Sequence, residues 1–543
     1  MIFNNLLDFI SSSYIFSKKK IRSLYLGSDI YNRKITPSII NSLDYCPSPS
    51  LLDSFIKYDK KKINIKNYSL NNIWYNKNLN EKDYKNLNSF FWLFSLDLKS
   101  SKRDTQNIIL QWIEKNHRYN SKSWEFDIVA KRIIAWTSNS KLTYEDGNSN
   151  YKSNFNEIII KQINHLINEI TRSEWVDDKM IGCAAIILTG LSYQNKDEHL
   201  KTGLELLKKL VKYSFNIDGF PKSRSIRQLC FYLKYFVLIR EWFKESQSEI
   251  PDFINENIYY LGQAYAFAWQ NNKKDLLFNG NHKTNNVDFD HYLKKLGYSF
   301  KNQSNELGGY ATLSNKKTSL IMDVGSSPDK KFSSSYQAGA LSFEISSNGK
   351  KLICNSGYFQ NHNHQLNELS KSSAVHSTLI LDDRSSCKFN KTDNKSSEIS
   401  HGLKILKRNI IFEKNYWKIN ASHDGYLKQY GIIHEREIEF YPEQIKFIGH
   451  DKIISKNNIK DLKFEIRFHL EPNIKIMKTQ NNKSILIELD GEGWKFNSDN
   501  NSMNIDDGLY FGKKDSFVDN QNIVISGMTN DENQTIKWEI TKI

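Results

Sequence analysis

The spacing of apolar residues changes along this chain, and that change limits the folds it can adopt. Between about residues 85 and 270, apolar residues recur at steps of three and four, as in NEIIIKQINHLINEI (156–170) and HLKTGLELLKKLVKYSF (199–215). This spacing gathers them on one face of a helix. QLCFYLKYFVLIREWF (228–243) is apolar on nearly all sides and predicts a helix buried between others. With further helices expected at 90–96, 105–115 and 126–136, the region is predicted to be an array of helical hairpins.

From about residue 308 the apolar period becomes two, which is typical of strands. LGGYATLSNKKTSLIMDV (307–324) predicts two strands around an Asn-Lys-Lys turn, and ALSFEISSNGKKLICNSG (340–357) predicts a hairpin at Asn348-Gly349. Further strands are expected in HSTLILDD, YGIIHEREIEFY, LKFEIRFHL, KSILIEL and IKWEITKI. Many strands without intervening helices predict an antiparallel β-sandwich.

The polar, Asn-rich stretch 279–307 separates the two patterns. We therefore expect an α+β multidomain chain with three regions: an N-terminal extension (1–84), an α-helical domain (85–290) and a β-sandwich domain (291–543). Hydrophobic residues make up 39% of the chain and aromatic residues 13%, which excludes intrinsic disorder. No apolar run approaches the ~20 residues of a membrane span.

The net charge of +15 is compatible with nucleic acid or with an acidic polysaccharide, since both attract a basic surface. No zinc-finger, RNP or helix-turn-helix string is present, so we do not expect a nucleic-acid partner. The five cysteines are scattered without a CxxC pair, which argues against both a disulfide framework and a zinc ribbon. The N-terminus shows no clear signal peptide, so a cytoplasmic location stays open.

A series of strings resembles the heparinase II/III-like family of polysaccharide lyases, in the family's order over about residues 85 to 543. The strings are DGFPKSRS (218–225), LLFNGNH (276–282), YQAGALSFEI (336–345), LICNSGYF (352–359), SAVHSTLILDD (373–383), ASHDGYLKQYGIIHER (421–436), FHLEP (468–472) and GEGWKF (491–496). The resemblance implies an incomplete α/α toroid followed by an antiparallel β-sandwich. It also implies β-elimination on uronic-acid polysaccharides such as glycosaminoglycans. That reaction neutralises the C6 carboxylate, removes the C5 proton and protonates the departing O4.

The family's catalytic positions match this sequence poorly. The Asn-His pair of the family's toroid corresponds to Asp177-Asp178, and its tyrosine falls on Gln228, although Tyr232 lies one helical turn later. The family's His-x-His-x-Asp-Ala-Gly string corresponds to Ser333–Gly339.

The family's metal ligands are also mostly replaced. A metal-binding aspartate corresponds to Asn355, and His376 alone matches a ligand position. One histidine with serine and asparagine neighbours is a poor divalent site. We therefore predict no cofactor, and no structural zinc.

Eight residues are the candidates for the site. Acid–base roles are assigned to His376, His423, Tyr426 and Tyr232, and binding of a uronate carboxylate to Arg224, Arg227, His434 and Arg436. Structural interpretations stay open beside these roles: His376 as a hydrogen-bonded histidine that holds a strand, Ser-His-Asp-Gly-Tyr (422–426) as a turn shaped by its Asp-Gly step, and Arg224 and Arg227 as a solvated helix start.

Two functions remain open. The first is a divergent lyase that cleaves an acidic polysaccharide by β-elimination. The second is a glycan-binding or cell-envelope polysaccharide assembly protein that keeps the fold without lyase chemistry. The resemblance implies a location in the cell envelope or periplasm.

Overall fold

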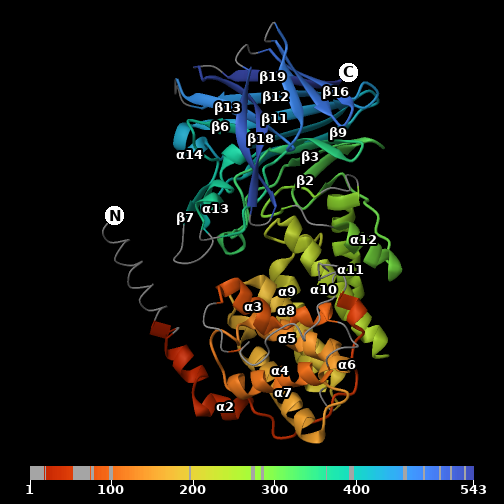
Figure 1. Cartoon of the computed structure of the whole chain (residues 1–543). Helices are drawn as coiled ribbons and strands as arrows, with labels where there is room; N and C mark the ends of the chain where they lie inside the picture. The colour runs from red at the N-terminus through yellow and green to blue at the C-terminus, as the bar shows by residue number, and fades with distance from the viewer. Residues whose placement is uncertain are drawn as a thin grey trace. The chain divides into compact units, whose positions relative to one another are not determined.

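The structure is a computed structural model that describes residues 17–18, 20–52, 74, 79–96, 102–194, 197–270, 275–282, 286–361, 364–390, 397–456, 461–480, 483–499, 503–513, 516–530 and 533–543. A helical N-terminal part is followed by antiparallel sheets, as predicted (Figure 1). The helices of the described part are α2 (Asp29–Ile35), α3 (Glu81–Ser89), α4 (Lys102–Asn116), α5 (Phe126–Ser138), α6 (Ser140–Thr143), α7 (Ser149–Glu169), α8 (Val176–Ser192), α9 (Asp197–Ser214), α10 (Ile226–Glu245), α11 (Asp252–Tyr265), α12 (Asn286–Lys295), α13 (Gln365–Leu369) and α14 (Leu427–Tyr430). Within those residues, no helix is long and apolar enough to cross a bilayer.

Helix α7 shows why the helical part folds as it does. The Asn148 side chain accepts a hydrogen bond from the Tyr151 backbone N–H and caps the first turn. Phe155, Ile159 and Ile163 then recur at four-residue steps and are fully buried. The expected helix at 90–96 is instead a 3₁₀ turn over Phe91–Ser95, because Phe90 adopts a left-handed conformation that ends α3.

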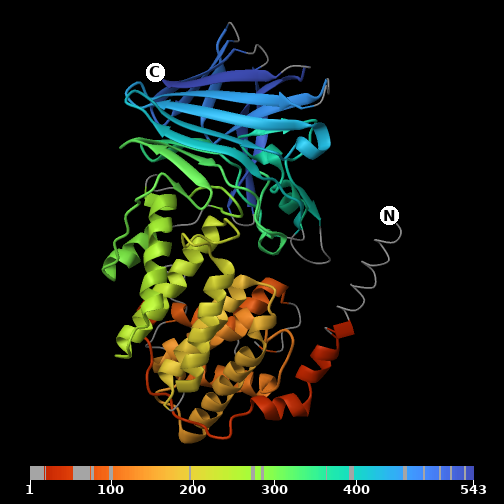
Figure 2. The same ribbon diagram turned by 180° about the vertical axis from the view of Figure 1, so that it is seen from behind.

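The C-terminal part contains two large antiparallel sheets and a small one (Figure 2). The first large sheet has the order β1-β2-β3-β4-β5-β13-β18-β17, with β6 paired to β13, and the second has the order β14-β15-β16-β19-β12-β11-β10-β9. The strands are β1 (Glu306–Leu307), β2 (Tyr310–Ser314), β3 (Thr318–Asp323), β4 (Phe343–Ser347), β5 (Lys350–Cys354), β6 (Leu379–Leu381), β7 (Lys388–Asn390), β8 (Glu398–His401), β9 (Ile405–Phe412), β10 (Trp417–His423), β11 (Ile432–Tyr441), β12 (Lys446–Ser455), β13 (Lys463–Leu470), β14 (Lys475–Lys478), β15 (Ser484–Leu489), β16 (Glu492–Ser498), β17 (Met503–Lys513), β18 (Ser516–Met528) and β19 (Gln534–Lys542).

The two large sheets share one hydrophobic core and so form the predicted sandwich. The ring of Trp538 from the second sheet stacks on Phe343 of the first with centroids 5.3 Å apart, and meets Phe468 at 5.0 Å. Gly449, paired with Trp538 on the neighbouring strand, leaves the space that this indole fills, since a side chain there would overlap the ring.

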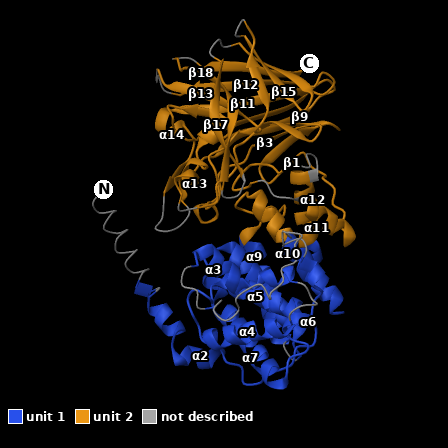
Figure 3. Cartoon of the chain, viewed as in Figure 1, with its two compact units in different colours: residues 1–213, 234–256 blue, residues 214–233, 257–543 orange. Residues whose placement is uncertain are grey.

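The chain packs into two compact units: residues 1–213 with 234–256, and residues 214–233 with 257–543 (Figure 3). This division differs from the boundary expected at residue 290, because residues from the helical region pack with the sandwich. Arg224, for example, hydrogen-bonds to Asp323 of β3. In the first unit, part of the expected N-terminal extension is helical. Tyr31 of α2 is fully buried, and its hydroxyl lies 2.8 Å from His165 Nδ1 of α7.

Candidate functional site

Two of the predicted histidines lie in one buried chain of hydrogen bonds inside the sandwich. His423 Nδ1 accepts from the Gly425 backbone N–H, so the neutral ring carries its proton on Nε2. That nitrogen lies 3.3 Å from His434 Nδ1, and His434 Nε2 lies 2.7 Å from Asp451 Oδ1. Burial lowers the pKa of both histidines, so each stays neutral. His423 then donates its Nε2 proton to His434, and His434 donates its own to Asp451.

Arg436 completes this network from the same face of β11. Its Nε and Nη2 donate to the two oxygens of Asp451, and its Nη1 donates to the carbonyls of Leu341 and Ser377. Burial would raise the pKa of Asp451, but the Arg436 guanidinium and the hydrogen bond from His434 together outweigh it and hold that pKa below its usual range. Arg436 and His434 are fully buried, so both are placed in the interior of the sandwich and not at a surface that a polysaccharide reaches.

His376 is also buried, with its ring against Gly339. Neither of its ring nitrogens has a hydrogen-bond partner among the described residues, and burial lowers its pKa to about 3. The family's metal would need more donors than this position offers. Asn355, at the position of the family's metal-binding aspartate, already accepts from the Ser377 N–H through its Oδ1. Within the described part of the chain, no three His, Cys, Asp or Glu side chains gather, so these residues do not fit a divalent metal.

Two more candidates form structural contacts. Tyr426 is buried, and its hydroxyl donates to the Leu379 carbonyl over 3.0 Å. Arg224 pairs with Asp323 at 2.6 Å and donates to the carbonyls of Gly309 and Gly325, where a Cβ on either glycine would overlap the guanidinium. Arg224 thus ties the turn before α10 to β2 and β3, as a buried and paired charge.

The remaining candidates lie on the first turns of α10. Tyr232 is buried, with its ring 4.9 Å from that of Phe215. Arg227 is half-buried and lies close enough to Tyr358 for its charge to affect that phenol. Burial raises the pKa of Tyr358 to about 12, and the Arg227 cation opposes this shift. The Tyr358 hydroxyl lies 3.5 Å from the Ser334 carbonyl.

A group of which sequence reasoning selected only Arg227 forms around Ser333–Gly339, the string aligned with the family's His-x-His-x-Asp-Ala-Gly. Gln337 joins two loops there: its Oε1 accepts from the Gly280 N–H, and its Nε2 donates to the Gly357 carbonyl. Two residues beyond Gly280, His282 Nδ1 lies 2.9 Å from Gln360 Nε2. We refer to Arg227, His282 and Tyr358 as the Arg227 group.

The signal for this group was present in the sequence. LLFNGNH contains His282 and LICNSGYF contains Tyr358, and both strings carried the resemblance. Their residues were not selected because only the contacts of Gln337 show that the two loops meet.

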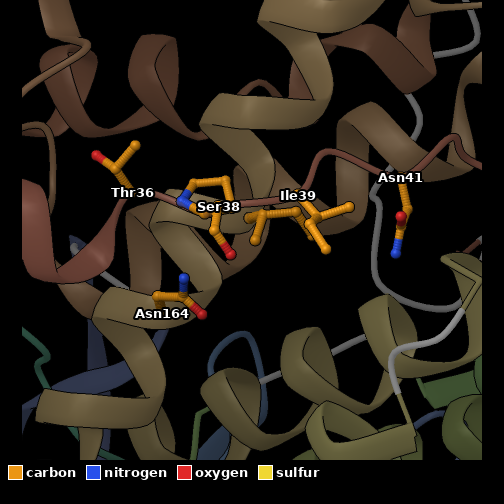
Figure 4. Close-up of a pocket in the computed structure, with 7 residues that line it drawn as sticks. Thr36, Ser38, Ile39, Asn41 and Asn164 are labelled. Carbon is orange, nitrogen blue, oxygen red and sulfur yellow. The ribbon is translucent and has the colours of Figure 1, made fainter.

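Asp178, at the position of the family's toroid Asn-His pair, lies in the first turn of α8. Its carboxylate accepts from Ser173 Oγ at 2.9 Å. Burial, with the nearby Asp127 charge, raises its pKa to about 7. In the same unit, a pocket of about 380 Å³ beside α7 is lined by neutral residues: Thr36, Pro37, Ser38, Ile39, Asn41, Ile160 and Asn164 (Figure 4). This lining contains no cationic side chain that could bind a carboxylate.

Comparison with known proteins identifies the C-terminal part. Residues 303–539 match the family model Heparinase II/III-like, C-terminal. A search of curated proteins finds no match.

Solved structures match most of the chain. The heparan sulfate lyase HepC from Pedobacter heparinus matches with a TM-score of 0.64 at 13% identity, covering 87% of this chain and 78% of its own. A heparinase III matches with a TM-score of 0.66 at 15% identity, covering 91% and 84%. At these identities the likeness shows the fold, a helical toroid with a β-sandwich. The chain has this fold, and the resemblance seen in its sequence is confirmed for the C-terminal part, where residues 303–539 match the heparinase II/III-like C-terminal domain.

Proposed function

We propose that this chain is a polysaccharide lyase that cleaves an acidic, uronic-acid-containing glycan by β-elimination. The observation that carries the proposal is the Arg227 group, which lies next to Ser333–Gly339, the string aligned with the family's His-x-His-x-Asp-Ala-Gly. The heparinase II/III-like C-terminal domain supports the same reaction class.

The Arg227 group offers the functional types that elimination needs. A guanidinium such as that of Arg227 binds a carboxylate through two parallel hydrogen bonds, and neutralising the C6 carboxylate makes the C5 proton more acidic. An imidazole at His282 serves the transfer of the C5 proton, and water protonates the departing O4. Tyr358 is enclosed like the histidines of the sandwich, so we give it a positioning role beside Arg227.

The burial of other candidates favours a second function. His376, His423 and His434 are enclosed and neutral, so none of them faces solvent as an acid or a base. A glycan-binding protein of the cell envelope that has lost elimination chemistry would keep this fold with its histidines enclosed.

The test is incubation with a panel of uronic-acid polysaccharides, followed by ultraviolet absorbance of 4,5-unsaturated uronates. We expect product from at least one acidic glycan, and its loss in Arg227→Ala. Arg240→Ala on the same helix is the matched control, since Arg240 pairs with Glu241 and Asn255. Binding without product from any glycan would establish the second function, and neither binding nor product would contradict both.

A further inference from the structure

A second pocket lies in the helical unit, between α8 and α9. It has a volume of about 260 Å³ and an apolar floor that includes Ile170, Cys183 and Leu210. Its rim carries Lys179 of α8 with Lys209 and Tyr213 of α9. Steps of four residues place Lys209 and Tyr213 on one face of α9, as they do Lys179 and Cys183 on α8.

The rim combines an aromatic ring with two cations. Tyr213 is 40% exposed although it is a large aromatic residue, and Lys179 Nζ lies 5.6 Å from the centre of its ring. Lys209 is exposed. Asp178 lies next to Lys179 in the chain, but the residues that line the pocket include no carboxylate.

These features fit a sugar ring that carries a carboxylate. A pyranose presents an apolar C–H face that packs on an aromatic ring, and the indole or phenol rings of proteins supply such rigid contact area. The volume is below the range of about 300–1,000 Å³ for drug-sized ligands, which limits the occupant to a small one. Two lysines at the rim favour an anion over a neutral sugar, because an ammonium gains from a charged acceptor.

We propose that this pocket is a binding subsite for one uronate residue of an acidic glycan, with its C–H face on Tyr213 and its carboxylate on Lys179 and Lys209. The choice of substrate class rests on the proposed function. The subsite uses no residue of the Arg227 group, so it holds the glycan without taking part in its cleavage.

The test is calorimetric titration of the full chain with three probes: a short galacturonate oligomer, the same oligomer with its carboxyls reduced to alcohols, and decanoate. We expect the acidic oligomer to bind. Replacing both lysines, in Lys179→Gln with Lys209→Gln, should weaken it on the order of tenfold or more, because a hydrogen bond to a charged group is lost. Tyr213→Ala should weaken it and Tyr213→Phe should restore it.

Lys201→Gln is the matched control, because Lys201 is exposed on α9 but does not line the pocket. Binding is compared only among variants that melt at the same temperature as wild type, and lyase product is measured on the same samples. Weaker binding in the pocket variants supports the subsite whether or not wild type forms product, so a failed lyase assay leaves this inference standing. Equal binding by the reduced oligomer, tighter binding by decanoate, or unchanged binding in the double lysine variant would overturn it.

Discussion

Removing the charge of Asp451 tests the interpretation of the buried network. The carboxylate accepts from Arg436, from His434 and from Trp538 Nε1 at 2.8 Å, and all of these groups are enclosed. In Asp451→Asn one oxygen becomes an NH₂ group that faces these donors, and the Arg436 cation is left buried without its anion. Breaking a buried pair in this way costs about 3–5 kcal/mol.

The size of the melting shift follows from the size of the unit. The sandwich unit contains roughly 300 residues, so its unfolding entropy near the midpoint is about 0.6 kcal/mol per kelvin. A loss of about 3–5 kcal/mol therefore lowers the melting temperature by roughly 5–8 °C. Asp490→Asn is the matched control, because Asp490 forms an exposed pair with Lys350 and such pairs contribute about 0–1 kcal/mol.

The pH dependence separates Asp451 from the histidines. The pKa of this carboxyl is lowered in the folded state, so its stabilisation is present above the ordinary value of 3.8 and is lost as pH falls below it. The difference in melting temperature between wild type and Asp451→Asn, measured by calorimetry, should stay constant from about pH 5 to 8 and shrink in stronger acid. A shift below about 1 °C, or a difference that changes between about pH 6 and 7 as for a titrating histidine, would refute the assignment.

Further predictions concern both units and the metal. Arg224→Lys should lower the unfolding free energy of the sandwich unit by about 2 kcal/mol in denaturant titrations, because lysine cannot reach Asp323 and the glycine carbonyls together. Asp178→Asn should stabilise the helical unit near pH 8 and have no effect near pH 3. The raised pKa of Asp178 means that the folded state loses unfolding free energy, at most about 4 kcal/mol, as pH rises from about 4 to 7 and the carboxyl is forced to ionise. Equal melting shifts at both pH values would contradict this. Tyr31→Phe should cost about 1–2 kcal/mol, since it leaves His165 Nδ1 buried without its partner, and an unchanged urea midpoint would show otherwise. Chelation of divalent ions should leave the melting temperature and any lyase activity unchanged, and a loss of either would indicate a metal site.

Local signals predicted the fold well. The period of two and the Asn348-Gly349 dipeptide placed β4 and β5 on either side of the turn where they are found. The three- and four-residue period likewise placed α7 and α9, and the stretch that is apolar on nearly all sides placed α10. These patterns work because they report which face of an element is buried, and that depends on neighbours a few residues away.

The period of two along β11 also indicated that His434 and Arg436 are buried. Along β11, Ile432, His434, Arg436, Ile438 and Phe440 alternate on one face, and all of them are buried. The two polar residues therefore belong to the core face by the rule that identified the strand. We predicted them as substrate contacts from their chemical type, although their position in the alternation indicated burial.

The Arg227 group could not be assembled from the sequence for a different reason, although Arg227 itself was a candidate. Its members come from segments more than 50 residues apart in the chain, and the hydrogen bonds of Gln337 bring two of these segments together. No periodicity contains that information.

The mass of the reaction products tests the central proposal most directly. Elimination divides a glycan without adding water, so the product masses should sum to the mass of the substrate. We predict this result for at least one uronic-acid oligosaccharide, with the unsaturated end on one fragment and the reaction absent in Arg227→Ala. Fragments whose masses sum to substrate plus one water would show hydrolysis, and would contradict the assignment of this chain as a lyase.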